Sequence, residues 1–157
     1  MFGVSGVRGI YGDNLTDEVA ELFAYAFGRL YGGPVVVGRD SRTSGESLSQ
    51  AVISGLRKGG MDVIDLGLAS TPTTEMAVTA QEAAGGIIIT ASHNPEQWNG
   101  LKFLGPEGVF LNAEESAELL EEYNIQGGVD KKPLSGEVIP WDGVEDYHIE
   151  AILGLGI

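Results

Sequence analysis

Two patterns of hydrophobic and polar positions alternate along residues 16–90. Short apolar runs rich in β-branched residues are typical of strands buried on both faces of a sheet, and they occur at 35–37, 63–66 and 86–90. Apolar residues spaced for one helical face predict three helices, which begin after Thr16, near Ser44 and at the cap Thr71 before Pro72. This alternation predicts a parallel sheet with right-handed crossovers and helices on both faces. The expected fold is therefore α/β, with three αβα layers and a mostly parallel sheet.

The pattern changes after residue 100. Apolar residues at 101–104 and 109–111 flank a glycine- and proline-containing turn at 105–108, and they predict a hairpin that adds one antiparallel edge strand. Asn112 predicts the N-cap of a fourth helix that extends to about Tyr123. Its inward-facing residues are expected to be Ala117, Leu119 and Leu120. Residues 125–140 contain several glycines and prolines and predict a loop.

The last residues predict an amphipathic helix at 144–153, followed by an apolar tail. An apolar helix and tail require a partner surface, so we expect either self-association there or a following segment that is absent from this chain. The residues expected to form that contact are Tyr147, Ile149, Ile152 and Leu153. We accordingly divide the chain into a first domain, 1–141, and a C-terminal helix, 142–157, that leads toward a second domain.

Three loops follow the predicted parallel strands, at 38–45, 67–72 and 91–99. They meet at the carboxyl edge of the sheet, where open α/β folds bind their ligands. Ser92 lies in the third loop and is the candidate nucleophile. A direct pair with His93 as general base is disfavoured, because adjacent side chains in an extended segment point to opposite faces. The absence of a G-x-S-x-G elbow also counts against a serine hydrolase.

Composition excludes several classes of protein. The 157 residues, 43% of them hydrophobic, suffice for one domain with a core. A net charge of −14, from 9 basic against 23 acidic residues, disfavours nucleic acid and anionic membranes as partners. Neither a membrane-length apolar run nor a signal pattern is present. Zero cysteines exclude disulfides and thiolate metal sites, so we expect a soluble, cytoplasmic protein.

Three of the five arginines lie in glycine-rich motifs. Arg8 lies in Gly3-Val4-Ser5-Gly6-Val7-Arg8-Gly9, Arg39 and Arg42 lie in Gly38-Arg39-Asp40-Ser41-Arg42, and Lys102 follows Asn99-Gly100. Positive charge placed in glycine loops of an acidic protein indicates a local anion site.

Together these motifs resemble the first domain of the α-D-phosphohexomutases, which include phosphoglucomutase, phosphomannomutase and phosphoglucosamine mutase. The resemblance covers nearly the whole chain and is closest to archaeal members. The segments that support it are 2–9, 38–42, Thr71-Pro72, 90–95, Asn99-Gly100 and Lys102. One departure is Val4, where the family often has threonine, and it affects a loop hydrogen bond rather than the chemistry.

The resemblance implies that Ser92 is phosphorylated in the active enzyme. It would donate its phosphoryl group to a hexose phosphate substrate and regain one from a bisphosphate intermediate. Lys102 and Arg8 match positions that serve in proton transfer and charge stabilisation. His93 and Asn94 would shape the loop.

Further binding residues follow from the same likeness. Ser5 would lie on the loop beside Ser92, and an Mg²⁺ ion would be bound through the phosphorylated Ser92. Arg39 is a candidate phosphate-binding cation, although Arg39, Asp40 and Arg42 could equally form a structural ion-pair cluster at the strand end.

The resemblance also shows what this chain lacks. The Asp-x-Asp-x-Asp magnesium loop, the sugar-binding Gly-Glu motif and the final phosphate-binding loop of the family's other domains are absent. We therefore expect the isolated chain to be incompetent as a mutase. The sequence does not identify which hexose phosphate is the substrate. The alternative is a freestanding, non-enzymatic module that binds phosphorylated ligands or a partner protein.

Overall fold

The structure, a computed structural model, describes residues 2–3, 6–126 and 129–156. Within these residues one sheet of seven strands has the order β1-β2-β6-β5-β3-β4-β7. The strands are β1 (Phe2–Gly3), β2 (Gly6–Ile10), β3 (Val35–Arg39), β4 (Val63–Leu68), β5 (Gly85–Ile89), β6 (Trp98–Leu104) and β7 (Val138–Pro140). The helices are α1 (Asp17–Tyr31), α2 (Gly45–Lys58), α3 (Thr71–Ala80), α4 (Ala113–Ile125) and α5 (Val144–Leu153), with a 3₁₀ turn at Val129–Lys131.

The parallel half of the sheet confirms the three predicted strands. β3 pairs in parallel with both β4 and β5, so it lies at the centre of this half. β7 extends it by pairing with β4, from Val63 opposite Val138. The prediction of a loop throughout 125–140 is therefore wrong at β7. Its three residues are exposed and end in a proline, which a sheet edge tolerates, and a strand this short shows no alternating pattern.

The antiparallel half is larger than predicted. β6 pairs antiparallel with β5 on one side and with β2 on the other, so it lies inside the sheet. Residues 109–111 form no second hairpin strand, because only an isolated bridge joins Leu104 to Phe110. The N-terminal strands β2 and β1 take the edge instead. Local pattern did not predict this, because pairing between residues so far apart in the chain is a tertiary contact.

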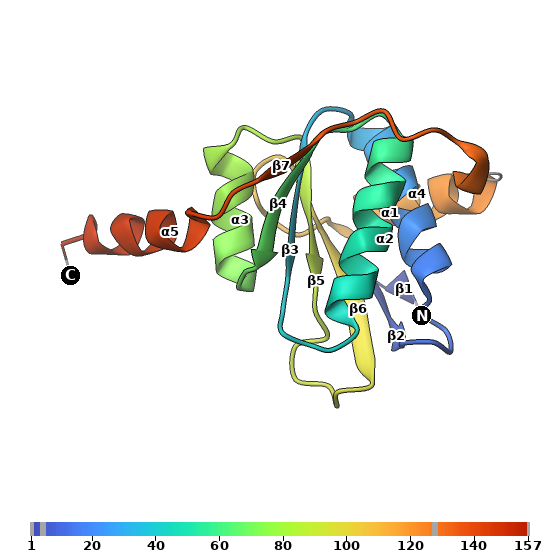
Figure 1. Ribbon diagram of the computed structural model, residues 1–157, viewed down its shortest axis with the longest axis horizontal. Coiled ribbons are helices and arrows are strands. Elements are labelled where there is room, and N and C mark those ends of the chain that lie inside the picture. The colour runs from blue at the N-terminus through green and yellow to red at the C-terminus, as the bar shows by residue number, and fades with distance from the viewer. Residues whose placement is uncertain (1, 4–5, 127–128, 157) are drawn as a thin grey trace.

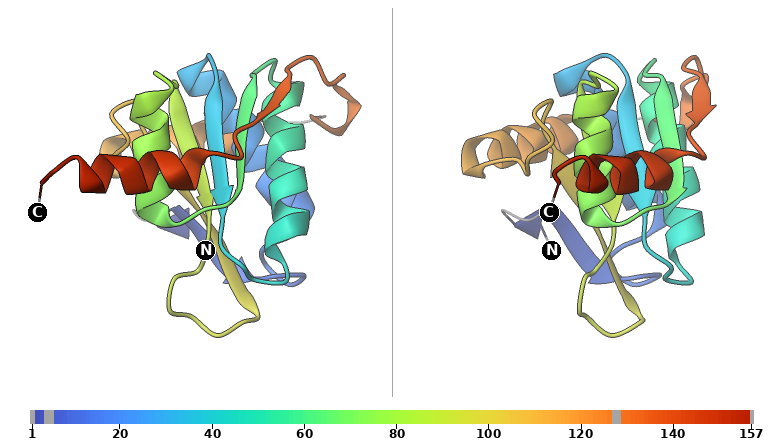
Figure 2. Two further views of the ribbon diagram at one scale, coloured as in Figure 1. Left: turned by 60° about the vertical axis from the view of Figure 1, so that its left-hand side comes forward. Right: turned by 90° about the vertical axis from the view of Figure 1, so that its left-hand side faces the viewer.

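Helices cover both faces of the sheet, which confirms the three-layer α/β arrangement (Figures 1 and 2). α1, α2 and α4 lie on one face, where Phe23 stacks between Phe2 and Tyr123 at centroid distances of 5.4 and 3.8 Å. α3 and α5 lie on the other face, over a smaller apolar cluster that includes Val36 and Ile88.

The helix ends follow the expected capping chemistry with one correction. The side chain of Thr16 caps α1, and Asn112 forms a capping box with Glu115 at the start of α4. The predicted cap Thr71 is wrong, because Ser70 accepts the N–H of Thr73 and Thr71 is already helical. In α4 the structure places Leu119 in the core but leaves Ala117 exposed.

α5 extends away from the body of the domain (Figure 1). It is joined to α3 by a hydrogen bond of 2.8 Å between Thr73 Oγ1 and His148 Nδ1. The four apolar residues predicted as a contact surface are exposed: Tyr147, Ile149, Ile152 and Leu153. No helix among the described residues is long and apolar enough to cross a membrane.

Candidate functional site

The loops after β3, β4 and β5 meet at the carboxyl edge of the sheet, as predicted. The N–H of Asp40 donates to the carbonyl of Ile89 at 3.0 Å, and the N–H of Ala69 donates to the carbonyl of Arg39 at 3.0 Å. The chain runs from β3 outward to β4 and then returns to β5 on the other side of β3. The carboxyl ends of β3 and β5 therefore form a topological switch point, the place where α/β sheets bind ligands.

Ser92 lies in the loop after β5, with its side chain exposed to solvent. Its φ is +55°, in the left-handed region that favours glycine. A non-glycine residue in this region costs of the order of 1–2 kcal/mol, and such residues persist where the surroundings hold them. The backbone N–H of Ser92 donates to Thr90 Oγ1 at 3.0 Å. Neighbouring residues therefore maintain the left-handed backbone conformation of Ser92, and its hydroxyl is exposed at this loop.

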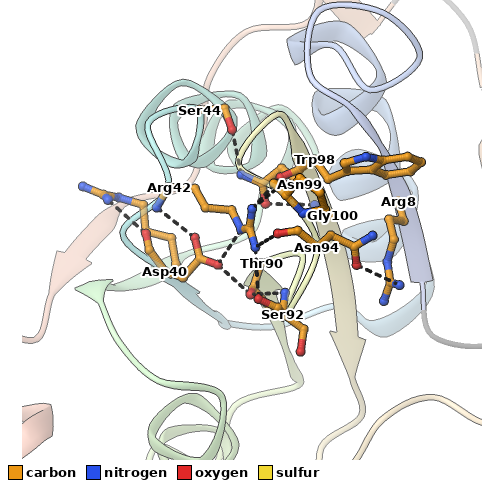
Figure 3. Close-up of polar contacts among 12 residues, drawn as sticks. Arg8, Asp40, Arg42, Ser44, Thr90, Ser92, Asn94, Trp98, Asn99 and Gly100 are labelled. Atoms are coloured by element: carbon orange, nitrogen blue, oxygen red, sulfur yellow. Dashed lines mark hydrogen bonds and ion pairs between the residues drawn. The ribbon is translucent and has the colours of Figure 1, made fainter.

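Arg42, in the segment after β3, binds this loop through its guanidinium group (Figure 3). Its Nη1 donates to the carbonyls of Pro95 and Trp98 at 2.9 and 3.1 Å. Its Nη2 donates to the carbonyls of Ser92 and Asn94 at 3.0 and 2.8 Å. One guanidinium group thus holds four peptide groups between residues 92 and 98.

Asp40 joins Arg42 to the strand end. Its Oδ2 accepts from Arg42 Nε at 3.2 Å and from the Thr90 hydroxyl at 2.6 Å, and its Oδ1 accepts the Arg42 N–H at 3.1 Å. The Arg42 side chain is 12% exposed and that of Asp40 is 30% exposed. Sequence reasoning did not select Asp40, Arg42 or Thr90 as site residues. The available signal was the placement of two charged motif residues at a strand end, which suggested an ion-pair cluster, and the structure confirms the pair.

A second polar contact fixes the far end of the loop. Asn99 is fully buried, and its Nδ2 donates to Ser44 Oγ at 2.9 Å, while its Oδ1 accepts the N–H of Gly100 at 2.9 Å. Ser44 belongs to the segment that starts α2, so the loop is bound both to the end of β3 and to the helix that follows it.

Arg8 reaches the Ser92 loop from β2. It pairs with Gly100 of β6 in the sheet register, and its Nη1 donates to Asn94 Oδ1 at 3.3 Å. Lys102 is two residues further along β6, opposite Ile88 of β5. Successive side chains alternate between faces, so Arg8 and Lys102 project from the same face of the sheet as diagonal neighbours.

The Lys102 ammonium group lies beside helix α3. It is 5.4 Å from the centroid of the Phe110 ring. Burial raises the pKa of the Glu75 carboxyl group on α3, and the charge of Lys102 partly offsets that rise. No hydrogen bond between Lys102 and the Ser92 loop occurs within the described residues. The structure therefore brings Arg8 into contact with the Ser92 loop. It places Lys102 on the same face of the sheet, but beside Phe110 and Glu75 rather than beside that loop.

The remaining predicted residues are distributed around the loop. His93 is exposed at the loop tip, and Asn94 is half-buried under Arg8. Arg39 donates to the carbonyl of Asp40 at 3.4 Å and lines a pocket of about 290 Å³ together with Ser70. Ser5, like Val4, lies outside the described residues.

The residues at this edge do not fit a magnesium site by themselves. Mg²⁺ prefers an octahedral set of oxygen ligands that includes carboxylates. Both oxygens of Asp40 already accept hydrogen bonds, and Ser92 offers a single hydroxyl. Within residues 2–3, 6–126 and 129–156, no group of three or more His, Cys, Asp and Glu side chains could hold a metal ion.

Comparison with known proteins supports the family resemblance. A family model described as phosphoglucomutase/phosphomannomutase, alpha/beta/alpha domain I, matches residues 1–127. A phosphoglucomutase/phosphomannomutase of Thermococcus kodakarensis is 48% identical over 160 residues, which cover 97% of this chain and 35% of the relative. A probable phosphoglucosamine mutase of the same organism is 45% identical over 149 residues, covering 93% and 33% of the two chains.

A solved structure agrees in fold. The putative phosphomannomutase from Thermus thermophilus has a TM-score of 0.83 and 33% identity, covering 94% of this chain and 34% of that one. The chain therefore spans about a third of the length of the relatives it matches.

Proposed function

Because the chain belongs to the phosphoglucomutase/phosphomannomutase family, as its alpha/beta/alpha domain I, we propose that it is the phosphoserine-bearing domain of a phosphohexomutase. That enzyme interconverts hexose 1-phosphate and hexose 6-phosphate through a bisphosphate intermediate. The observation that supports this proposal best is Ser92, an exposed hydroxyl in a left-handed backbone conformation at the switch point of the sheet.

In the proposed reaction, the bond between Ser92 Oγ and phosphorus breaks as a hydroxyl oxygen of the hexose phosphate forms a new bond to the same phosphorus. The proton of that hydroxyl moves to a base, and the product is a hexose bisphosphate. The released Ser92 Oγ takes up a proton. In the second transfer the bond between phosphorus and the other sugar oxygen breaks as Ser92 Oγ bonds to that phosphorus, and the serine proton passes through a base to the freed sugar oxygen, which restores the phosphoserine. Such transfers depend mainly on positioning and on stabilising charge at the phosphoryl oxygens.

Cations must surround the phosphoserine for this chemistry. A phosphoserine brings about −1.5 to −2 charges at neutral pH, and the chain already has a net charge of −14. Arg8 stabilises that charge from β2, and Lys102 serves in proton transfer from the same face of the sheet. The diagonal arrangement of Arg8 and Lys102 across Gly100 supports both assignments.

The other loop residues support binding. His93 and Asn94 shape the loop, and Asn94 also accepts from Arg8. Arg39 and Ser5 complete the phosphate-binding set. Arg39 lines a pocket and uses only one N–H in a hydrogen bond within the described part of the chain, which leaves it able to bind an anion.

The rest of the mutase lies outside this chain, since the chain spans about a third of its relatives. Apart from one oxygen of the phosphorylated Ser92, the ligands of the family's Mg²⁺, like the sugar-binding groups, come from the domains that follow residues 1–141. The C-terminal segment 142–157 leads toward those domains. The isolated chain is consequently incompetent as a mutase.

Intact-mass spectrometry tests the role of Ser92. The chain is incubated with glucose 1,6-bisphosphate together with the remaining domains of a phosphoglucosamine mutase, and the expected result is a mass increment of one phosphoryl group. The variant Ser92→Ala should lose this increment. Ser41→Ala, which removes an exposed serine in the neighbouring loop, should retain it. A phosphoryl group on Ser92→Ala, or none on the wild type, would contradict the proposal and favour a non-enzymatic binding module.

A coupled assay tests the incompetence of the isolated chain. The substrates are glucose 1-phosphate, mannose 1-phosphate and glucosamine 6-phosphate, and we expect no turnover by the chain alone. Turnover that disappears in Ser92→Ala would show that the chain needs no further domain.

A further inference from the structure

Arg42 uses every hydrogen-bond donor that it has. A guanidinium group carries five N–H donors in a planar fork. The Nε–H donates to Asp40 Oδ2, and the four Nη–H groups donate to the carbonyls of residues 92, 94, 95 and 98. We infer that Arg42 is a positioning residue for the phosphoryl-carrying serine and takes no direct part in binding phosphate. This inference rests on the proposed function of Ser92.

The same network holds Ser92 at both of its backbone polar groups. Its carbonyl accepts directly from Arg42 Nη2 at 3.0 Å. Its N–H donates to Thr90 Oγ1, and the hydroxyl of Thr90 donates to Asp40 Oδ2 at 2.6 Å. The hydrogen bonds from the carbonyl and from the N–H of Ser92 therefore both lead to the Asp40–Arg42 ion pair. Fixing the peptide groups on either side of one residue fixes its φ and ψ, which explains how a serine is maintained at a φ of +55°.

The positive charge of Arg42 is already balanced within the protein. Asp40 neutralises it at 3.2 Å, and the guanidinium side chain is 12% exposed. A phosphate near Ser92 would therefore gain little attraction from Arg42 and would have to displace a carbonyl to obtain an N–H. Arg39 of the same motif differs, because the single hydrogen bond that its side chain makes within the described residues is one of 3.4 Å to the Asp40 carbonyl. The two arginines of the motif thus have separate tasks.

Positioning affects the rate of transfer rather than the affinity for substrate. Displacement of a reacting group by about 1 Å can lower a rate by roughly 100-fold. Lysine at position 42 keeps the positive charge but offers three donors from a single atom, so it cannot span four carbonyls. Arg42→Lys therefore removes the hydrogen bonds to the four carbonyls while it keeps the positive charge.

The first test measures amide hydrogen exchange in the 157-residue chain by NMR. Arg42→Lys and Thr90→Val should each accelerate exchange at Ser92 by roughly tenfold, the effect of losing one hydrogen bond. The matched controls are Arg57→Lys, which alters an arginine that donates to the Gly136 carbonyl at 2.7 Å, and Thr79→Val, which removes a helical hydroxyl. The controls should leave exchange at Ser92 unchanged. Unchanged exchange at Ser92 in both Arg42→Lys and Thr90→Val would overturn the inference.

The second test titrates inorganic phosphate into the chain and follows the Nε–H resonances of the arginines. The Arg42 resonance should stay in place. A saturable shift of the Arg42 resonance would make Arg42 a phosphate ligand and overturn the inference.

The third test uses a fusion of this chain to the remaining two thirds of the Thermococcus kodakarensis phosphoglucosamine mutase. With glucosamine 6-phosphate, Arg42→Lys should lower kcat by about 10- to 100-fold and change KM by less than about threefold, while Arg57→Lys leaves both constants unchanged. A raised KM with an unchanged kcat would overturn the positioning role. If the wild-type fusion and the mass measurement both fail, the proposed function of Ser92 fails, whereas the exchange result still decides whether Arg42 and Thr90 hold the loop.

Discussion

Replacing Gly100 by alanine tests whether the backbone around β6 approaches this position too closely to admit a side chain. Gly100 is buried in β6, pairs with Arg8 of β2, and accepts the N–H of Thr90 at 3.0 Å. A Cβ atom at this position would lie 2.6 Å from the Val7 carbonyl oxygen and 3.0 Å from that of Thr90. Both neighbours are backbone atoms, so neither can rotate away, and the strands would have to separate.

The expected cost follows from two opposing terms. Alanine in a strand gains about 0.5–1 kcal/mol over glycine, because the unfolded chain loses freedom. Overpacking a tight site costs about 1–3 kcal/mol, and obstruction by backbone favours the upper part of that range. We therefore expect Gly100→Ala to lower the free energy of unfolding by about 1–2 kcal/mol. At about 2–4 °C per kcal/mol for a chain of this size, the Tm should fall by several degrees.

Urea denaturation monitored by circular dichroism measures this change as a shift of the midpoint at constant m. Gly3→Ala is the matched control, because Gly3 also lies in a strand but a Cβ there would meet nothing within 4 Å. We expect Gly3→Ala to be neutral or slightly stabilising. A Gly100→Ala variant as stable as the wild type, with Gly3→Ala behaving as stated, would refute the reasoning.

Three further predictions concern the scaffold. Asn112→Ala removes the capping box of α4 and should lower the free energy of unfolding by about 1 kcal/mol in urea denaturation, and no change would contradict that role of the cap. Burial, reinforced by two nearby glutamates, raises the pKa of Tyr31 to about 12 from 10.0. As the pH rises, Tyr31 therefore loses its hydroxyl proton in the unfolded chain before it does so in the folded one. The stabilisation that neutral Tyr31 gives the folded state is complete below pH 10 and is lost between pH 10 and 12. After allowance for partial exposure the loss is about 1 kcal/mol, so Tyr31→Phe should show a shallower decline of the Tm over that interval, and an identical decline would contradict it. Ile152→Asp combined with Leu153→Asp should reduce self-association of the chain at high concentration, and unchanged sedimentation would argue against α5 as the contact.

The central strands and most helices could be predicted because their signals are local. β3, β4 and β5 are short apolar runs between glycines and polar residues, and α1 and α4 begin at side-chain caps that were identified correctly. β7, and the place of β2 beside β6 with β1 at the edge, could not be predicted. β2 pairs with β6 and β7 pairs with β4, in each case residues far apart in the chain, and β7 is too short at three residues to show a period of two.

The site shows the same division. The position of Ser92 after a predicted parallel strand identified it, because the carboxyl ends of parallel strands share one edge, whereas Arg8 was identified from its glycine-rich motif and the family resemblance. Which arginine of the Gly38–Arg42 motif holds the loop was beyond sequence reasoning. Arg39 and Arg42 are the same residue type three positions apart, and only their surroundings distinguish them.

By itself the amino-acid sequence determined the α/β class, the family and the candidate hydroxyl, since each depends on residue types at short spacing. The tertiary structure decided how that hydroxyl is held. The Asp40–Arg42 pair binds carbonyls more than fifty positions away in the sequence, and Thr90 links the backbone of Ser92 to the same pair. Such contacts depend on the crossover that places β3 beside β5, a pairing set by burial over the whole sheet rather than by local sequence.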